Sequence, residues 1–257
     1  MAQAPPGRIF VQADMAQLEY RIIAALAGSA RLLKIFRDKL DAHIDMARFV
    51  FGEDYFDSLP PDVQENLRTI VKRVVYALGY GAMPKRITMS LREDRKMPID
   101  VRALIDFTRV SDIWNGFFRR NPEIHGWRNS LLQFVDENGY LEIPPLGRRR
   151  YFPLPADRNK VFNWPVQTLG SDIVNLALSR VDDRLPANAW PLIHGHDSGL
   201  WECDEVDGAE VAHIVEEEFE YELNGPAGPV RLYAEAEIVR AWYEGKKWPH
   251  PEAPLEL

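Results

Sequence analysis

The sequence RIFVQAD, residues 8–14, is an apolar, β-prone run that stops at an aspartate. Its alternation predicts a buried strand that ends at Asp14. A second aspartate, Asp197, lies between the runs WPLIHG (190–195) and LWEC (200–203), which predict a β-hairpin with a tight polar turn. If these strands lie side by side in one sheet, the two carboxylates meet at the same edge of that sheet.

Two carboxylates at one sheet edge suit a divalent metal. An aspartate beside apolar strands must be paired, solvated or bound to a metal. Two hard oxygen ligands with positions left open for water and phosphate are what Mg²⁺ prefers. A pair of such ions about 3.5–4 Å apart stabilises both the attacking and the leaving oxygen in phosphoryl transfer. Taken singly, Asp14 also fits a cap of the following helix, and Asp197 also fits an ordinary turn residue.

A second candidate group follows helical spacing. Arg68, Lys72, Tyr76 and Tyr80 are each four residues apart, which places them along one stripe of a helix. Two cations followed by two aromatic rings suit a triphosphate at one end and a sugar and base at the other. The alternative interpretation is a helix whose valines at 71, 74 and 75 are buried while its cations are solvated.

Bulk properties limit the class of protein. A chain of 257 residues can bury one large core or two modest ones. Its single cysteine, Cys203, excludes an intrachain disulfide and a metal–thiolate cluster, which favours a reducing setting. No apolar run is long enough to cross a bilayer, and the N-terminal stretch lacks a secretory signal. We therefore expect a cytoplasmic protein without a membrane partner.

Charge is unevenly distributed along the chain. The net charge of −8 by itself argues against a nucleic-acid ligand. However, phosphate affinity depends on the local field, which is screened over roughly 8–10 Å. Two basic runs provide such local fields, whereas the acidic run 216–218 is interpreted as a solvated face. The shorter basic run, Arg148-Arg149-Arg150, follows a Pro-Pro-Leu-Gly turn. The longer basic run comprises Arg68, Lys72, Arg73, Lys85, Arg86, Arg92, Arg95 and Lys96.

The remaining pattern predicts an α+β architecture, in which a sheet is assembled from distant segments with helices between them. EIPPLGRRRYFPLP (142–155) is interpreted as a turn-and-hairpin region, and VRLYAEAEIV (230–239) as a final strand. Helices are expected at 17–27, 30–51, 61–80, 100–118, 122–138 (closing at Gly139) and 165–184.

Several of these segments resemble motifs of the family A DNA polymerases, the family of bacterial DNA polymerase I. DMAQLEYR (14–21) is similar to the first palm motif. The stripe that begins at Arg68 and ends at Gly81 is similar to the fingers-helix motif, and His196-Asp197 is similar to the second palm motif. Weaker matches fall in the same order along the chain: Ala42-His43-Ile44 through Phe51-Gly52, GRRRYFP (147–153), NWPVQ (163–167) and Val239 to Tyr243.

The resemblance implies a metal site and a triphosphate site. Asp14 and Asp197 would hold two Mg²⁺ ions, with the backbone carbonyl of Met15 as a further ligand. The triphosphate of an incoming dNTP would be held by Arg68, Lys72 and His43. Lys72 would also protonate the leaving pyrophosphate.

The resemblance also implies contacts to the sugar, the base pair and the DNA. Glu19 would be the steric gate that excludes a ribose 2′-hydroxyl, with Gln17 supporting the sugar. Tyr80 would lie beside the nascent base pair, and the hydroxyl of Tyr76 would stand in for a missing 3′-hydroxyl, which predicts relaxed discrimination against dideoxynucleotides. The residues expected to contact primer–template DNA are Asn163 and Gln167 in the minor groove, His196 near the primer end, and Arg148, Arg149 and Arg150.

Domain organisation follows from the same resemblance. A palm is expected over residues 1–27 and 138–257, with helical fingers inserted over 28–137. The thumb, the segment before the first palm motif and a 3′–5′ exonuclease domain have no counterpart in this sequence. We therefore expect a protein partner that carries the thumb, the exonuclease region or both, as in a split polymerase, in the cytoplasm of a bacterial or phage-infected cell.

The sequence departs from the family pattern at several positions. Ser198 stands where a second acid usually follows the aspartate, and Asn159 stands where an arginine is usual. His-Asp-Ser is typical of the related single-subunit RNA polymerases, so RNA synthesis is an alternative, although Glu19 and the Ala-Leu-Gly run before Tyr80 favour DNA. Residues 82–121 show no clear family pattern and are assigned only to the fingers.

A further alternative is a catalytically silent module with a polymerase fold that binds DNA or nucleotide. The presence of both aspartates and both cations argues against it, because a scaffold has no need to hold like-charged carboxylates together.

Overall fold

The computed structural model describes residues 2–79, 81–95, 98–143 and 147–242. The chain divides into two compact units, one formed by residues 1–18, 168–223 and 231–257 and the other by residues 19–167 and 224–230. Some sequence predictions, at Tyr80, Lys96, residues 144–146 and Tyr243, lie outside the described residues. The helices that are described are not long and apolar enough to span a membrane.

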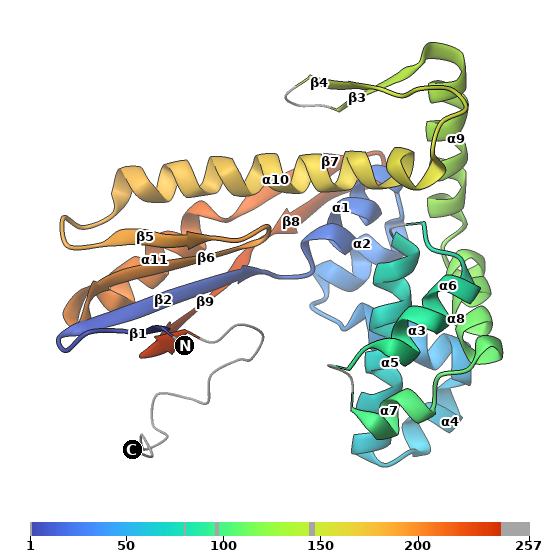
Figure 1. The fold of residues 1–257 in the computed structure, drawn as a ribbon, viewed down its shortest axis with the longest axis horizontal. Helices are drawn as coiled ribbons and strands as arrows, with labels where there is room; N and C mark the ends of the chain where they lie inside the picture. The colour runs from blue at the N-terminus through green and yellow to red at the C-terminus, as the bar shows by residue number, and fades with distance from the viewer. Residues whose placement is uncertain (1, 80, 96–97, 144–146, 243–257) are drawn as a thin grey trace. The chain divides into compact units, whose positions relative to one another are not determined.

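The first unit is built on a four-stranded antiparallel sheet with the order β5-β6-β2-β9 (Figure 1). Its strands are β5 (Trp190–His194), β6 (Ser198–Asp204), β2 (Arg8–Met15) and β9 (Ala234–Val239). β2 is central and comes from the opposite end of the chain to its two neighbours. The strand predicted at residues 8–14 and the hairpin predicted around Asp197 are both confirmed, and the α+β class is confirmed with them.

One face of this sheet is covered by helix α11 (Gly208–Glu218). Ile9, Val11, Ala13 and Met15 alternate along β2 and are buried. The helix can approach closely because it starts at a glycine: a Cβ on Gly208 would lie 3.2 Å from the Ile9 side chain. α11 was not predicted. It follows a short 3₁₀ turn, η1 (Glu205–Asp207). The acidic residues 216–218 at its end were interpreted only as a solvated face, without a helix.

The final strand predicted at 230–239 is wrong in its extent. β8 (Gly228–Leu232) pairs with β7 (Tyr221–Gly225) in a separate two-stranded ribbon, whereas β9 joins the four-stranded sheet. The break falls at Tyr233, whose carbonyl accepts a hydrogen bond from the Ala16 N–H at 2.9 Å. A further short pair joins β1 (Ala2–Gln3) to β10 (Ala241–Trp242).

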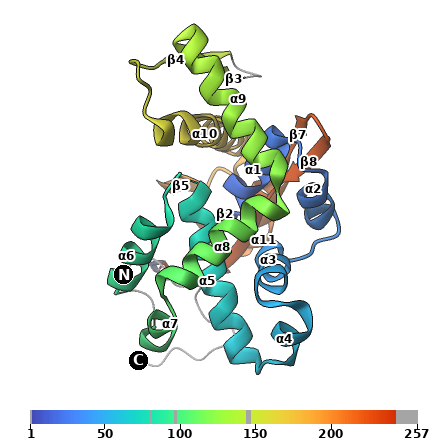
Figure 2. The same ribbon diagram turned by 90° about the vertical axis from the view of Figure 1, so that its right-hand side faces the viewer.

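The second unit is mainly helical. α3, α5 and α8 pack against one another (Figure 2). The helix predicted at 30–51 is in fact two helices, because the chain turns at Lys39, which has a left-handed φ of 54°. The helix predicted at 100–118 is likewise divided. The helices are α1 (Leu18–Ala27), α2 (Ala30–Arg37), α3 (Ala42–Phe51), α4 (Glu53–Ser58), α5 (Pro61–Gly79), α6 (Pro84–Glu93), α7 (Ile99–Ala103), α8 (Phe107–Arg120) and α9 (Pro122–Asn138).

After α9, Gly139 adopts the left-handed conformation expected at a helix end, with φ 76°. The chain then forms the hairpin of β3 (Tyr140–Ile143) and β4 (Arg148–Tyr151) and enters α10 (Arg158–Arg184). α10 starts seven residues before the predicted position 165. The Asp157 carboxylate accepts N–H groups at its first turn, which begins the helix well ahead of Pro165.

Candidate functional site

The two predicted metal-binding aspartates lie at the same end of neighbouring strands in the first unit. The register pairs Asp14 with Ser198, and the Met15 N–H donates to the Asp197 carbonyl at 2.8 Å. Asp14 is exposed and Asp197 is half-buried. Both aspartates therefore lie at the same end of the sheet. Both are accessible to solvent, as carboxylates that bind and release a metal ion must be.

The hairpin that carries Asp197 depends on two glycines. The Gly195 N–H donates to the Ser198 carbonyl at 2.7 Å, and a Cβ on Gly195 would lie only 2.2 Å from the Ser198 Oγ. A Cβ on Gly199 would lie 2.3 Å from the buried ring of Trp201. A side chain at Gly195 would have to displace Ser198, and one at Gly199 would have to displace the Trp201 ring, so both glycines support the local structure that carries the aspartate.

The donor set at this edge is oxygen-rich. Within the described residues, no three His, Cys, Asp or Glu side chains gather into a metal-binding group. On its other side Asp14 pairs with Glu235 of β9, an acid that the sequence analysis did not single out. Cys203 is not available as a thiolate, because burial raises its pKa to about 11. Carboxylates with open positions fit Mg²⁺.

The stripe on α5, in the second unit, has the two faces that the sequence predicts. The valines at 71, 74 and 75 are buried, whereas Lys72 is exposed and Arg68 and Tyr76 are half-buried. The Lys72 Nζ lies 5.9 Å from the centre of the Tyr76 ring, within the range of a cation–π contact. Cations and an aromatic ring thus share the polar face of one helix.

Arg68 is held by an acid that the sequence analysis missed. Its Nε and Nη2 donate to the Asp41 Oδ2 at 2.8 and 2.7 Å, and its Nη1 donates to Glu65 at 2.9 Å. Asp41 is also the N-cap of α3, accepting the backbone N–H groups of His43 and Ile44. An aspartate just before a helical pattern predicts an N-cap, so the capping role of Asp41 could have been predicted from the sequence. The contact of Asp41 with Arg68 could not.

His43 is buried in the second unit. Its side chain is 1% exposed and its ring stacks on Tyr20, with 5.5 Å between ring centres, and lies 5.7 Å from Tyr76. Neither ring nitrogen has a hydrogen-bond partner among the described residues. Burial lowers the pKa of His43 to about 4, so the ring is neutral at pH 7.

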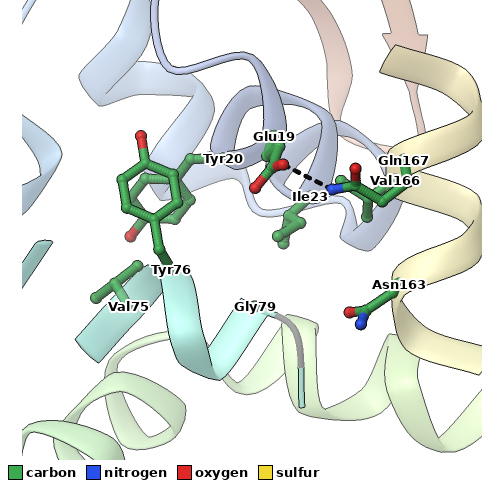
Figure 3. Close-up of a pocket in the computed structure, with 9 residues that line it drawn as sticks. All are labelled: Glu19, Tyr20, Ile23, Val75, Tyr76, Gly79, Asn163, Val166 and Gln167. Carbon is green, nitrogen blue, oxygen red and sulfur yellow. Dashed lines mark hydrogen bonds between the residues drawn. The ribbon is translucent and has the colours of Figure 1, made fainter. Parts of the chain in front are cut away.

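A pocket in the same unit brings together four predicted site residues from three helices that are far apart in the sequence. Figure 3 shows Glu19 from α1, Tyr76 from α5, and Asn163 and Gln167 from α10 around this pocket. The Gln167 Nε2 donates to the Glu19 Oε1 at 2.6 Å (Figure 3). The predicted sugar gate and a predicted minor-groove residue are therefore in direct contact.

The remaining predicted site residues are distributed over both units. Gln17 follows β2 with a left-handed φ of 52°, and His196 is exposed at the tip of the β5–β6 hairpin. The arginines at 148, 149 and 150 are exposed on β4. Arg149 donates to Glu142 at 2.6 Å and lies over the Tyr140 ring.

A buried arginine at the end of α5 was also missed. Arg128 of α9 is 7% exposed and donates through Nη2 to the Leu78 carbonyl at 2.5 Å and the Gly79 carbonyl at 3.0 Å. Burial lowers its pKa to about 10. It satisfies the last carbonyls of the helix that carries the Arg68 stripe. No local sequence signal indicates this contact, because its partners are backbone atoms about 50 residues earlier.

Comparison with solved structures defines the class of fold. The chain is similar to the POL domain of Pol1 from M. smegmatis, solved in complex with DNA primer-template and dNTP. The TM-score is 0.73 with 24% sequence identity, covering 93% of this chain and 41% of that chain. The mixed α+β fold with its antiparallel sheet is therefore that of a polymerase domain.

Sequence comparison then gives the family. Residues 1–244 match DNA polymerase family A. The chain is 30% identical over 256 residues to the thermostable DNA polymerase I of Thermus filiformis, covering 95% of this chain and 28% of that protein. It is 26% identical over 252 residues to DNA polymerase I of Caldicellulosiruptor bescii, covering 93% of this chain and 27% of that protein. The chain belongs to DNA polymerase family A and spans under a third of the length of these curated relatives.

Proposed function

We propose that this chain carries the palm and fingers of a DNA polymerase and transfers nucleotides from dNTPs to a primer 3′-hydroxyl. Residues 1–27 and 138–257, which include the four-stranded sheet, would be the palm, and the helical residues 28–137 would be the fingers. The observation that carries this proposal is the convergence of Asp14 and Asp197 at one end of adjacent strands. Membership of DNA polymerase family A supports this proposal.

Asp14, Asp197 and the Met15 carbonyl would hold two Mg²⁺ ions. When bound, the ions would stabilise the attacking 3′-oxygen and the leaving pyrophosphate oxygen. The donor chemistry supports this assignment, since both carboxylates are accessible and a thiolate ligand is excluded. His196, at the tip of the same hairpin, would lie near the primer end, and Gln17 would support the sugar.

The polar face of α5 would bind the triphosphate. Lys72 is exposed, and its ammonium group is a proton donor at the end of a flexible side chain. It would hold phosphate oxygens and then protonate the leaving pyrophosphate. Arg68 would bind phosphate through those of its N–H groups that do not donate to Asp41 or Glu65. His43 would join them only after its ring leaves the packing between Tyr20 and Tyr76.

The pocket beside α5 would receive the sugar and the base pair. Glu19 would exclude a ribose 2′-hydroxyl, and its hydrogen bond to Gln167 supports this role by fixing the carboxylate. Asn163 and Gln167 would face the minor groove of the primer–template duplex, Tyr80 would lie beside the nascent base pair, and Arg148 to Arg150 would contact the DNA backbone.

The hydroxyl of Tyr76 gives this proposal a specific substrate preference. If it replaces a missing 3′-hydroxyl, the protein accepts dideoxynucleotides readily. We expect Tyr76→Phe to raise discrimination against ddNTPs by about tenfold or more, the loss of roughly one good hydrogen bond. Equal incorporation of ddNTPs by the wild type and the variant would contradict this role.

We further propose that a partner polypeptide supplies the thumb, and with it most of the grip on duplex DNA. The test is Mg²⁺-dependent primer extension, with dNTPs and with rNTPs, by the chain alone and with candidate partner chains. Extension with dNTPs should be lost in Asp14→Asn and Asp197→Asn while DNA binding is retained. Preference for rNTPs would indicate an RNA polymerase. DNA binding without extension in every combination would indicate the silent accessory module.

A further inference from the structure

The guanidinium of Arg68 is surrounded by carboxylates in the second unit. Its Nε and Nη2 both donate to the Asp41 Oδ2, and its Nη1 donates to the Glu65 Oε1. These bonds use three of the five N–H groups that a guanidinium carries. A residue proposed to bind triphosphate therefore has two acidic partners, and each of them either orients Arg68 for the phosphate or competes with the phosphate for it.

The two acids differ in how firmly they are held. The Asp41 side chain is 25% exposed, and its second oxygen, Oδ1, accepts the backbone N–H groups of His43 at 2.8 Å and Ile44 at 3.0 Å. Burial alone would raise the pKa of Asp41, but Arg68 and these two N–H groups hold that pKa below its ordinary value. Asp41 is thus a charged group anchored at both oxygens.

Among the described residues, Glu65 has no comparable anchor. Its side chain is 61% exposed, and it makes a single-nitrogen contact with Arg68 from three residues earlier on the same helix. Exposed pairs of this kind contribute little, and water or another anion replaces them readily. A phosphate approaching Arg68 would therefore displace Glu65 from Nη1 and leave Asp41 in place.

We infer that Asp41 is a positioning residue for triphosphate binding, holding Nε and Nη2 of Arg68 so that Nη1 is presented to phosphate, while Glu65 occupies that position when no phosphate is bound. The inference rests on the proposed function of Arg68. It also connects two predicted triphosphate ligands, because the same carboxylate caps the helix on which His43 lies.

The substitution Asp41→Asn separates the two roles of this side chain. Asparagine is as good an N-cap as aspartate, so α3 is retained. Its single carbonyl oxygen is used by the cap, which turns the amide N–H₂ toward Arg68 and removes the charged hydrogen bonds. Glu65→Gln is the matched control on the other acid. Thermal melts of both variants establish that the fold is intact.

The measurement is calorimetric binding of inorganic tripolyphosphate to the whole chain. Asp41→Asn should weaken binding by about tenfold, as expected for loss of a charge-assisted contact. Glu65→Gln should strengthen it by about threefold, because a screened competitor is removed. In the Arg68→Ala background, Asp41→Asn should have no further effect, which a purely structural role would not produce. In primer extension, KM for dNTP should rise in Asp41→Asn with little change in kcat.

Three outcomes would overturn the inference. Unchanged or tighter tripolyphosphate binding by Asp41→Asn, with Arg68→Ala still impaired, would make Asp41 a bystander or a competitor and would leave the proposed function standing. An equal effect of Asp41→Asn with and without Arg68 would show that it acts elsewhere. Absence of tripolyphosphate binding in the wild type, or full binding by Arg68→Ala, would overturn the triphosphate role of Arg68 as well.

Discussion

The buried ring of His43 predicts a pH-dependent loss of stability. In an unfolded chain a histidine titrates near pH 6.5, whereas burial lowers the pKa of His43 in the folded protein to about 4. Between these values the unfolded state binds more protons than the folded state. The stability contributed by neutral His43 is therefore complete above pH 6.5 and is lost as the pH falls toward 4.

The magnitude follows from the size of the shift. A pKa lowered from about 6.5 to about 4 corresponds to about 3 kcal/mol over the whole window and about 2 kcal/mol between pH 7 and pH 5. The charges around the ring act in both directions. Asp41 favours the protonated form, whereas Lys72 and Arg68 oppose it, so burial is the largest cause.

The assay is urea unfolding of the wild type and of His43→Phe at pH 7 and pH 5. Phenylalanine keeps a ring between Tyr20 and Tyr76 and removes the titrating group. The variant should lose about 2 kcal/mol less than the wild type between the two pH values. His125→Phe, at an exposed position, is the control for the substitution itself. Equal losses in the wild type and His43→Phe, within about 0.5 kcal/mol, would refute the reasoning.

Three further predictions concern contacts in the two units. Arg128→Met should lower the free energy of unfolding by about 2–4 kcal/mol in urea, because it leaves the last carbonyls of α5 without their charged donor. Gly199→Ala should cost about 1–3 kcal/mol in the same assay, because the new methyl group meets the buried Trp201 ring. Gln167→Leu should reduce discrimination against rNTPs in primer extension by about tenfold, because Glu19 loses the donor that fixes it.

Matched variants make these results specific. Arg128→Lys keeps the charge near the same carbonyls and should lose less stability than Arg128→Met. Gly126→Ala is the control for Gly199→Ala, because a Cβ on Gly126 meets no atom within 4 Å. Loss of stability in Gly126→Ala equal to that in Gly199→Ala, or unchanged rNTP discrimination in Gln167→Leu, would contradict the respective explanation.

Local patterns predicted those parts of the fold whose causes are local. The strand before Asp14 and the hairpin around Asp197 follow from alternation and turn chemistry, and the end of α9 follows from Gly139. The segment 230–239 was predicted as one strand because β-propensity is continuous through it. Its division at Tyr233 is set by pairing partners, β7 for one half and β2 for the other, which lie far away in the sequence.

The candidate site shows the same limit. The residues matched to family motifs could be named from the sequence, whereas the groups that hold them could not. Asp41 is 27 residues from Arg68, and Gln167 is 148 residues from Glu19. Each contact depends on which helix faces come together, and no spacing within a single helix or strand encodes it.

Charge gives the strongest example, because a count of cations overstates the field that a phosphate meets. In the basic run from 68 to 96, Arg68 lies on Asp41, and the Arg73 Nη1 is 3.6 Å from the Asp94 Oδ2. A cation paired with a carboxylate contributes little beyond the Debye length. Lys72 is exposed and forms no ion pair with the other described residues, so its charge is the least compensated of these three. Phosphate affinity should therefore follow the partners of individual cations, which is why removing one weakly held acid is expected to strengthen binding.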